Sequence, residues 1–224
     1  MPRRTPTKGT CELCGKVCTK RAMAQHLRGC AQNKNGAKSK SRSSAFHIIA
    51  ESPYDHRYWL HIEADRDAKL IELDDFLRGI WLECCGHMSA FRIKNKGYTA
   101  PEAIRETGDR DMYIRLDTIL SPGLKFQYEY DFGSTTEVAL SVVGIEPSKR
   151  DSAVALLARN EPLVFPCTQC GRTATEFCGD ECLWAEGPGG SVLCEKCSSK
   201  HGCDKDMRMP IVNSPRMGVC GYSG

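Results

Sequence analysis

The chain has 224 residues, of which 41% are hydrophobic and 26% are charged, and its formal net charge at pH 7 is +3. This composition is ordinary for a soluble globular protein, and the length accommodates one large domain or two to three small ones. It excludes a membrane-spanning helix, because no apolar run approaches the ~20 residues that such a helix needs.

Fourteen cysteines are present, and the basic N-terminus is not followed by the apolar core of a secretory signal. Cysteines in a chain without an export signal indicate metal binding in a reducing compartment, because disulfides persist mainly in oxidising ones. We therefore expect a cytoplasmic protein. The alternative is a secreted protein with a disulfide-rich tail, which the paired spacing of the cysteines disfavours.

The charge is distributed unevenly along the chain. Residues 1–45 contain eleven Lys and Arg residues and one acid, Glu12, for a net charge of +10, whereas the rest contains 20 basic and 27 acidic residues, for a net charge of −7. A basic arm on an acidic body indicates nucleic-acid contact at one end. A solubilising tail explains the same charge equally well.

The first motif is C-x2-C-x11-H-x3-C, formed by Cys11, Cys14, His26 and Cys30. Thr19 is the expected N-cap of a helix through Arg28. His26 and Cys30 can share one helix face, because residues four apart lie on the same side. They can complete the tetrahedral zinc site that the Cys11–Cys14 pair begins. A segment of about 30 residues has almost no core, so zinc would supply its folding free energy.

This segment resembles a C2H2-type zinc finger with Cys as the fourth ligand, although its central spacing departs by one residue from that family. The predicted nucleic-acid-binding residues are the polar side chains on or near the exposed helix face: Lys20, Arg21, Gln25 and Arg28. In DNA-binding fingers such a helix enters the major groove. A finger that binds protein instead is the alternative. Residues 31–45 are basic and rich in polar residues, and we expect a flexible linker.

Residues 46–160 form the predicted central domain. Alternation predicts strands at 58–63 and 90–93, and apolar residues three and four apart predict a helix over Leu73–Glu83. A short helix is expected at Leu116–Leu120. Apolar residues of 125–133, including Phe132, fall on one strand face, and 136–146 is the return strand of a hairpin. We therefore expect an α+β fold with an antiparallel sheet covered by helices.

The blocks LDDFLRGIW, HMSAFRI and RLDTILSPGLKFQYEYDFG in this domain resemble the plasmid pRiA4b Orf3-like family. That family is also labelled as the passenger "TnpR" protein of the IS1096 element. The resemblance covers roughly residues 56–147 and implies an α+β fold and an association with mobile elements, without an established chemistry. Members usually carry an aromatic residue and a His after the DFG block, where this chain has Thr135–Val138.

Two features of the central domain could suggest an enzyme. Glu129 and Asp131 fall on the same strand face, and paired carboxylates can do acid–base work. Cys84 and His87 place a thiol near an imidazole in the sequence, although that is not the geometry a catalytic dyad needs. We predict instead a solvated strand face and cysteines that end a helix as small buried residues, so that no catalytic residue is assigned.

Residues 161–224 form the predicted C-terminal domain and hold eight potential zinc ligands within 37 residues. These ligands are Cys167, Cys170, Cys178, Cys182, Cys194, Cys197, His201 and Cys203. A cross-braced arrangement would group Cys167, Cys170, Cys194 and Cys197 around one ion and the other four around a second, and we prefer it because the C-x2-C pairs match. A sequential arrangement is the alternative, and Cys220 could replace Cys203.

The order of these ligands resembles the MYND-type zinc module, which is a protein-interaction domain, although that module usually has wider spacing around its His. Together the two ends predict about three Zn2+ ions per chain. The predicted function is a non-enzymatic, zinc-binding accessory or regulatory protein that contacts nucleic acid through residues 1–45. The alternative is a scaffold that binds a protein partner through the C-terminal module, and an enzyme with its site in the central domain is a third possibility.

Overall fold

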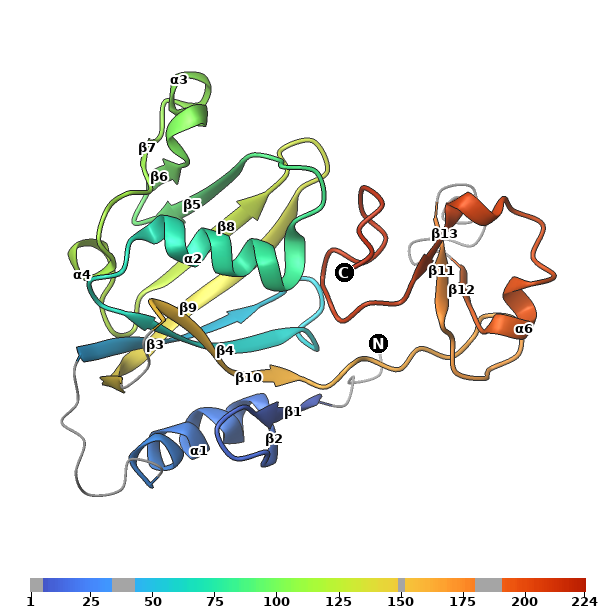
Figure 1. The fold of residues 1–224 in the computed structure, drawn as a ribbon, viewed down its shortest axis with the longest axis horizontal. Coiled ribbons are helices and arrows are strands. Elements are labelled where there is room, and N and C mark those ends of the chain that lie inside the picture. Colours follow the sequence, from blue (N-terminus) through green and yellow to red (C-terminus); the bar gives the residue numbers. More distant parts are fainter. Residues whose placement is uncertain (1–5, 34–42, 149–151, 180–190) are drawn as a thin grey trace. The chain divides into compact units, whose positions relative to one another are not determined.

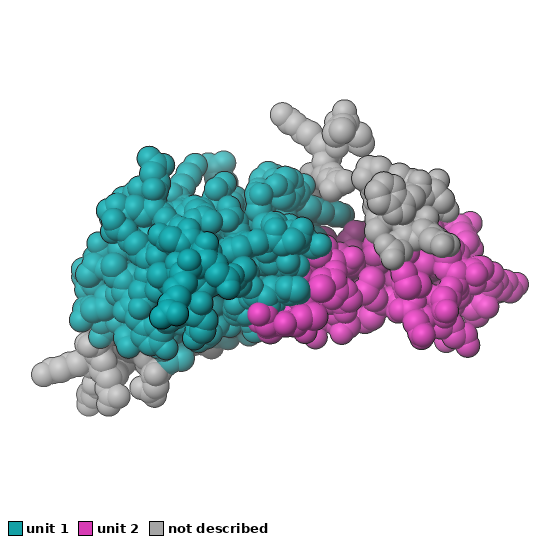
Figure 2. All heavy atoms as spheres, turned by 90° about the horizontal axis from the view of Figure 1, so that it is seen from above, with its two compact units in different colours: residues 1–79, 87–161 teal, residues 80–86, 162–224 magenta. Residues whose placement is uncertain are grey.

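A computed structural model describes residues 6–33, 43–148, 152–179 and 191–224. Figure 1 shows the fold coloured along the sequence. The chain divides into two compact units, which Figure 2 shows in teal and magenta. Unit 1 comprises residues 1–79 and 87–161, and unit 2 comprises residues 80–86 and 162–224. Each unit is described by itself below.

Unit 1 is built around a ten-stranded sheet with the order β2-β1-β10-β4-β3-β9-β8-β5-β6-β7. Its strands are β1 (Lys8–Cys11), β2 (Val17–Thr19), β3 (Ser43–Glu51), β4 (Trp59–Asp65), β5 (Ser89–Ile93), β6 (Lys96–Thr99), β7 (Arg110–Asp111), β8 (Lys125–Tyr130), β9 (Thr136–Ser148) and β10 (Val154–Asn160). The pairs are antiparallel except for β6 with β7. The predicted α+β class with a largely antiparallel sheet is therefore confirmed.

Few helices accompany this sheet in the described part of unit 1. They are α1 (Lys20–Asn33), α2 (Leu70–Leu77), the 3-10 turn η2 (Pro101–Ala103), α3 (Ile104–Thr107) and α4 (Leu116–Ile119). The π-helical turn η1 (Arg78–Leu82) follows α2 along the chain, and its last three residues belong to unit 2. The helix predicted over Leu73–Glu83 begins three residues earlier, at Leu70, where Glu72 Oε2 accepts a hydrogen bond of 2.7 Å from the Lys69 backbone N–H.

Alternate residues of β4 show that both faces of the sheet are covered. Trp59 packs in one buried cluster with Met23 and Leu27 of α1, whereas Leu60 and Ile62 are also fully buried. Successive side chains of a strand point to opposite faces, so α1 covers one face of β4 and the core beneath α2 lies on the other. Figure 1 shows α2 lying across the strands and α1 beside β10.

The predicted finger is joined to this sheet. Its first strand pairs with β10, so that Gly9 lies opposite Asn160 and Cys11 opposite Ala158. Its helix buries Met23 and Leu27 against Trp59. The sequence alone indicates a finger with almost no core, and the structure supplies that core from the central domain.

Unit 2 contains a small three-stranded sheet of β11 (Glu176–Cys178), β12 (Ser191–Leu193) and β13 (Arg208–Pro210), in the order β12-β11-β13. The short helix α6 (Glu195–Ser198) and the 3-10 turn η3 (Lys205–Met207) complete its regular structure. Its core consists mainly of the potential metal ligands together with Phe177, Val192 and Leu193. Residues 80–86 join this unit through Trp81, whose carbonyl accepts a hydrogen bond of 2.5 Å from Ser214 Oγ.

One local prediction was wrong. The strand β8 ends at Tyr130, Asp131 adopts a left-handed conformation with φ of 66°, and Phe132 is exposed rather than buried. Asp131 Oδ1 accepts hydrogen bonds from the backbone N–H groups of Gly133 and Ser134. This Asx turn reverses the chain earlier than apolar alternation indicates.

The linker predicted over residues 31–45 falls largely outside the described residues; residues 31–33 end α1 and residues 43–45 begin β3. Among the helices in the described ranges, none is both long and apolar enough to cross a membrane.

Close approach at Gly9 gives a test of how the finger docks. A Cβ atom at this position would lie 2.2 Å from the backbone oxygen of Arg159 and 2.4 Å from the Trp59 ring. We expect Gly9→Ala to lower the free energy of unfolding by about 1–3 kcal/mol, because the added methyl group must displace a neighbouring strand.

The matched control is Gly29→Ala on the exposed side of α1, where nothing lies within 4 Å of the added Cβ. This change should leave stability unchanged or raise it by up to about 1 kcal/mol. Urea unfolding in excess zinc measures both variants. Equal stability of the two variants would show that β1 does not dock against β10 as described.

Two buried histidines lie beneath α1. His61 Nε2 lies 3.2 Å from the Lys20 carbonyl oxygen and His61 Nδ1 lies 2.8 Å from His47 Nε2. The carbonyl can only accept, so His61 carries its proton on Nε2 and accepts from His47. Burial lowers the pKa of His47 to about 4 and that of His61 to about 3.

This pair should make stability depend on pH. Since both pKa values lie below the unfolded value of about 6.5, the unfolded state binds protons first as pH falls, and the free energy of unfolding should decrease from pH 7 to pH 4. His47→Gln should reduce this slope in denaturant titrations, whereas His56→Gln, which changes an exposed histidine, should not. Equal slopes in the two variants would contradict the assignment.

Candidate metal centres

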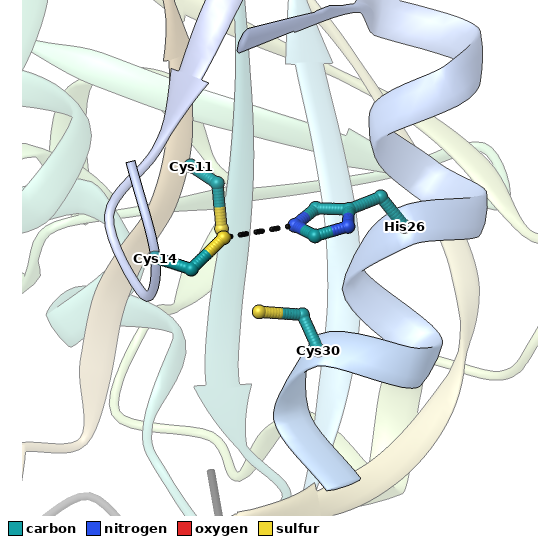
Figure 3. A group of neighbouring side chains, drawn as sticks. All are labelled: Cys11, Cys14, His26 and Cys30. Carbon is teal, nitrogen blue, oxygen red and sulfur yellow. Dashed lines mark hydrogen bonds between the residues drawn. The ribbon is translucent and has the colours of Figure 1, made fainter. Parts of the chain in front are cut away.

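The finger cluster consists of Cys11, Cys14, His26 and Cys30, and all four ligand atoms lie within 4.8 Å of one another. Figure 3 shows why: β1 and the turn after it present Cys11 and Cys14, and α1 presents His26 and Cys30 one helical turn apart. Cys14 Sγ lies 3.2 Å from His26 Nε2. The structure therefore brings together the four ligands that spacing predicts.

The electrostatics of the finger cluster favour a bound cation. Burial, followed by hydrogen bonding and charge repulsion from Cys11 and Cys14, raises the pKa of Cys30 to about 11. Burial likewise raises the pKa of Cys11. Three closely packed thiols do not all ionise at neutral pH by themselves, whereas a bound divalent metal deprotonates coordinating thiols outright.

The second group, which we call the four-thiol cluster, consists of Cys167, Cys170, Cys194 and Cys197, with all sulfurs within 4.8 Å of one another. It combines the two C-x2-C pairs, so the geometry follows the cross-braced grouping. Cys167 and Cys194 are buried in the core of unit 2. Cys197 lies in α6, and Cys194 lies directly before it.

Arg172 supports the four-thiol cluster from outside. Its Nε and Nη2 atoms each lie 3.5 Å from a sulfur, that of Cys170 and that of Cys194 respectively. Hydrogen bonding from Arg172 lowers the pKa of Cys170 to about 6, whereas hydrogen bonding with Cys170 and burial raise the pKa of Cys197 to about 12. The guanidinium of Arg172 therefore stabilises negative charge on the Cys170 side of this cluster.

The third group consists of Cys178, His201 and Cys203, whose ligand atoms also lie within 4.8 Å of one another. Arg208 holds the loop that carries the last two: its Nη2 atom donates hydrogen bonds of 2.9 Å and 2.7 Å to the His201 and Cys203 carbonyls. The predicted fourth ligand, Cys182, lies outside the described residues.

The donor types and spacings fit zinc. A tetrahedral zinc ion with bonds of about 2.3 Å to sulfur and about 2.0 Å to nitrogen separates two sulfurs by about 3.8 Å and a sulfur from a nitrogen by about 3.5 Å. The Cys170 and Cys194 sulfurs are 3.6 Å apart. The cysteines of the described residues are free thiols rather than disulfides. These clusters can therefore hold metal ions, and sulfur-rich sites are typical of structural zinc.

A fourth group escaped the sequence-based reasoning. The sulfurs of Cys84, Cys85 and Cys220 lie within 4.8 Å of one another in unit 2. Cys85 and Cys220 are exposed and Cys84 is half-buried, so the prediction that Cys84 and Cys85 are small buried residues was wrong for Cys85. Cys220 lies in this group rather than replacing Cys203. Cys18 belongs to none of the groups found in the described ranges.

The predicted nucleic-acid-binding residues lie on α1 with unequal exposure. Arg21, Gln25 and Arg28 are exposed, and their spacing of four and three places them on one helix face. Lys20 is half-buried and forms an ion pair with Glu51. The outward face of α1 is therefore basic, with Lys20 engaged within unit 1.

The two carboxylates considered for acid–base work do not form a site. Glu129 is half-buried, and its Oε2 lies 3.3 Å from Arg92 Nε. Asp131 is buried, and it organises the turn after β8 through Gly133 and Ser134. Each carboxylate thus has its own structural partners.

Comparisons with known proteins leave the family open. No family model matches the chain, and a search of curated proteins finds no relative. A solved structure, the protein of unknown function MM3350 from Methanosarcina mazei Go1, is similar with a TM-score of 0.42 and 16% identity; the match covers 49% of this chain and 64% of that protein. The resemblance to the pRiA4b Orf3-like family therefore stays a prediction.

The four-thiol cluster gives a direct test of metal binding. We expect Cys170→Ser to bind one zinc ion fewer than the unmodified chain in native mass spectrometry, because a serine hydroxyl does not replace a thiolate ligand. It should also lower thermal stability, since the cluster lies in the core of unit 2. The control Cys18→Ser should keep the full zinc content, and full zinc retention by Cys170→Ser would contradict the assignment.

Proposed function

We propose that this chain is a zinc protein with structural metal sites that acts by binding nucleic acid through its finger, as an accessory or regulatory protein. The single observation that carries this proposal is that ligands far apart in the sequence converge into closed sulfur-rich clusters. Structural zinc sites have four protein ligands, whereas a catalytic zinc keeps one position for water or substrate. The finger cluster and the four-thiol cluster each offer four ligands.

The nucleic-acid part of the proposal is supported by charge and exposure. Residues 1–45 carry a net charge of +10, and Arg21, Gln25 and Arg28 line the outward face of α1. The opposite face of α1 packs on Trp59, so the finger presents its basic side while the sheet holds it in place. Arginines presented in this way suit phosphate contacts, whose strength falls with salt.

The finger packs against the central domain, and this packing limits the variants that can test nucleic-acid binding. Deleting residues 1–45 would uncover Trp59 and leave β10 without its partner β1. Loss of DNA binding in that deletion would then be ambiguous. Substitutions of exposed side chains avoid this problem, because surface changes away from packing usually alter stability by less than about 0.5 kcal/mol.

We expect the double variant Arg21→Ala/Arg28→Ala to weaken binding to a random DNA duplex. If both arginines contact phosphates, the slope of log affinity against log salt should become shallower by about 1.8. The matched control is Lys94→Ala/Lys96→Ala, which removes the same charge from exposed positions at the β5–β6 turn. Its slope should stay that of the unmodified protein.

Two outcomes would contradict nucleic-acid binding by the finger. The first is that the full chain fails to bind the duplex at low salt. The second is that the two double variants change the slope equally, because the effect would then reflect net charge alone. Either result favours the alternative in which the C-terminal module binds a protein partner. The association with mobile elements stays a prediction in every case.

A further inference from the structure

The cysteines that the three predicted sites do not use include a converging set. Cys84 and Cys85 follow η1, and Cys220 lies near the end of the chain, yet their three sulfurs lie within 4.8 Å of one another. All three belong to unit 2. The sulfurs of the finger cluster and of the four-thiol cluster also lie within 4.8 Å of one another.

A buried arginine faces this group. Arg216 is fully buried, and its Nη2 atom lies 3.5 Å from Cys84 Sγ. Burying a guanidinium is costly unless negative charge lies nearby, and a metal-bound thiolate supplies it. Arg172 plays the same part beside Cys170 and Cys194.

The backbone around these cysteines repeats a feature of the predicted sites. Gly15 and Gly171, which directly follow Cys14 and Cys170, have φ values of 76° and 73°. Each donates its N–H to the carbonyl of the first cysteine of its pair, at 2.8 Å. The left-handed conformation closes a tight turn that presents both sulfurs to one point, and glycine adopts it at little cost.

The same conformation occurs on both sides of the additional group. Gly86 follows Cys85 with φ of 71°, and Gly221 follows Cys220 with φ of 67°. Cys220 itself has φ of 50°, which is uncommon for a residue with a side chain and marks a constrained position. The C-terminal turn is therefore shaped to hold the Cys220 sulfur in one place.

We propose that Cys84, Cys85 and Cys220 form an additional zinc site that fastens the C-terminal turn to residues 80–86. Like the finger cluster, this site offers three thiol ligands. The site ties together positions 136 residues apart in the sequence, where a link contributes most by closing a long loop. It extends the proposed function by a fourth structural ion and does not depend on nucleic-acid binding.

The test is a residue-resolved map of thiol alkylation on the full, zinc-loaded protein. Cys85 and Cys220 are exposed, so a metal-free thiol at either position reacts readily with N-ethylmaleimide. We expect both to be protected in the zinc-loaded protein and modified after chelation. Rapid modification of both in the zinc-loaded protein would overturn the site. So would an intact mass lighter by two hydrogens with a disulfide among the three cysteines.

Variants give an independent count of ions. Cys220→Ser should bind one zinc ion fewer than the unmodified chain in native mass spectrometry and expose Cys84 and Cys85 to alkylation, whereas Cys18→Ser should change neither. Unchanged zinc content in Cys220→Ser would overturn the proposal. If Cys220→Ser does not fold, the alkylation map of the unmodified protein tests the site by itself. Protection at Cys170 and Cys194 reports separately on the proposed function.

Discussion

The convergence of cysteine and histidine ligand atoms to within 4.8 Å of one another is the constraint on which the two ends of the structure depend. Burial and then its sulfur neighbours raise the pKa of Cys30, and hydrogen bonding with Cys170 and then burial raise that of Cys197. A divalent cation opposes these shifts, because it favours the deprotonated ligands and releases their protons. The folded positions of the turns around Cys14 and Cys170 are then stabilised by metal binding, and the small sheet of unit 2 has a core in which sulfur ligands stand where aliphatic side chains usually pack.

The two ends of the chain depend on metal to different degrees. The finger shares a sheet and a buried cluster with the central domain, so its strands and helix have hydrophobic support beyond the metal. Unit 2 has short strands and turns held by Arg172, Arg208 and Arg216 near the sulfur ligands. Because a small core seldom stabilises a domain of this size alone, unit 2 should be the part of the chain that loses structure first when zinc is removed.

Sequence spacing predicted the groups of metal ligands that lie close together along the chain. The C-x2-C pairs and the turn of helix between His26 and Cys30 each place ligands through a few peptide units, and the structure brings these ligands together. The alternation predicted through Phe132 is correct in β8 as far as Tyr130. The turn at Asp131 was missed because a hydrogen-bonding side chain, not hydrophobicity, determines it. Docking of Gly9 opposite Asn160 and convergence of Cys84 with Cys220 could not be predicted, since tertiary packing rather than spacing determines which distant residues meet.

Zinc K-edge X-ray absorption of the full chain tests the central claim most directly, because it reports the atoms bound to the metal rather than its amount. The account predicts four-coordinate zinc with a shell dominated by sulfur at about 2.3 Å and a minor nitrogen component at about 2.0 Å, without a water oxygen. A shell dominated by oxygen or nitrogen would contradict it, as would a folded protein that carries no zinc and has its cysteines in disulfides.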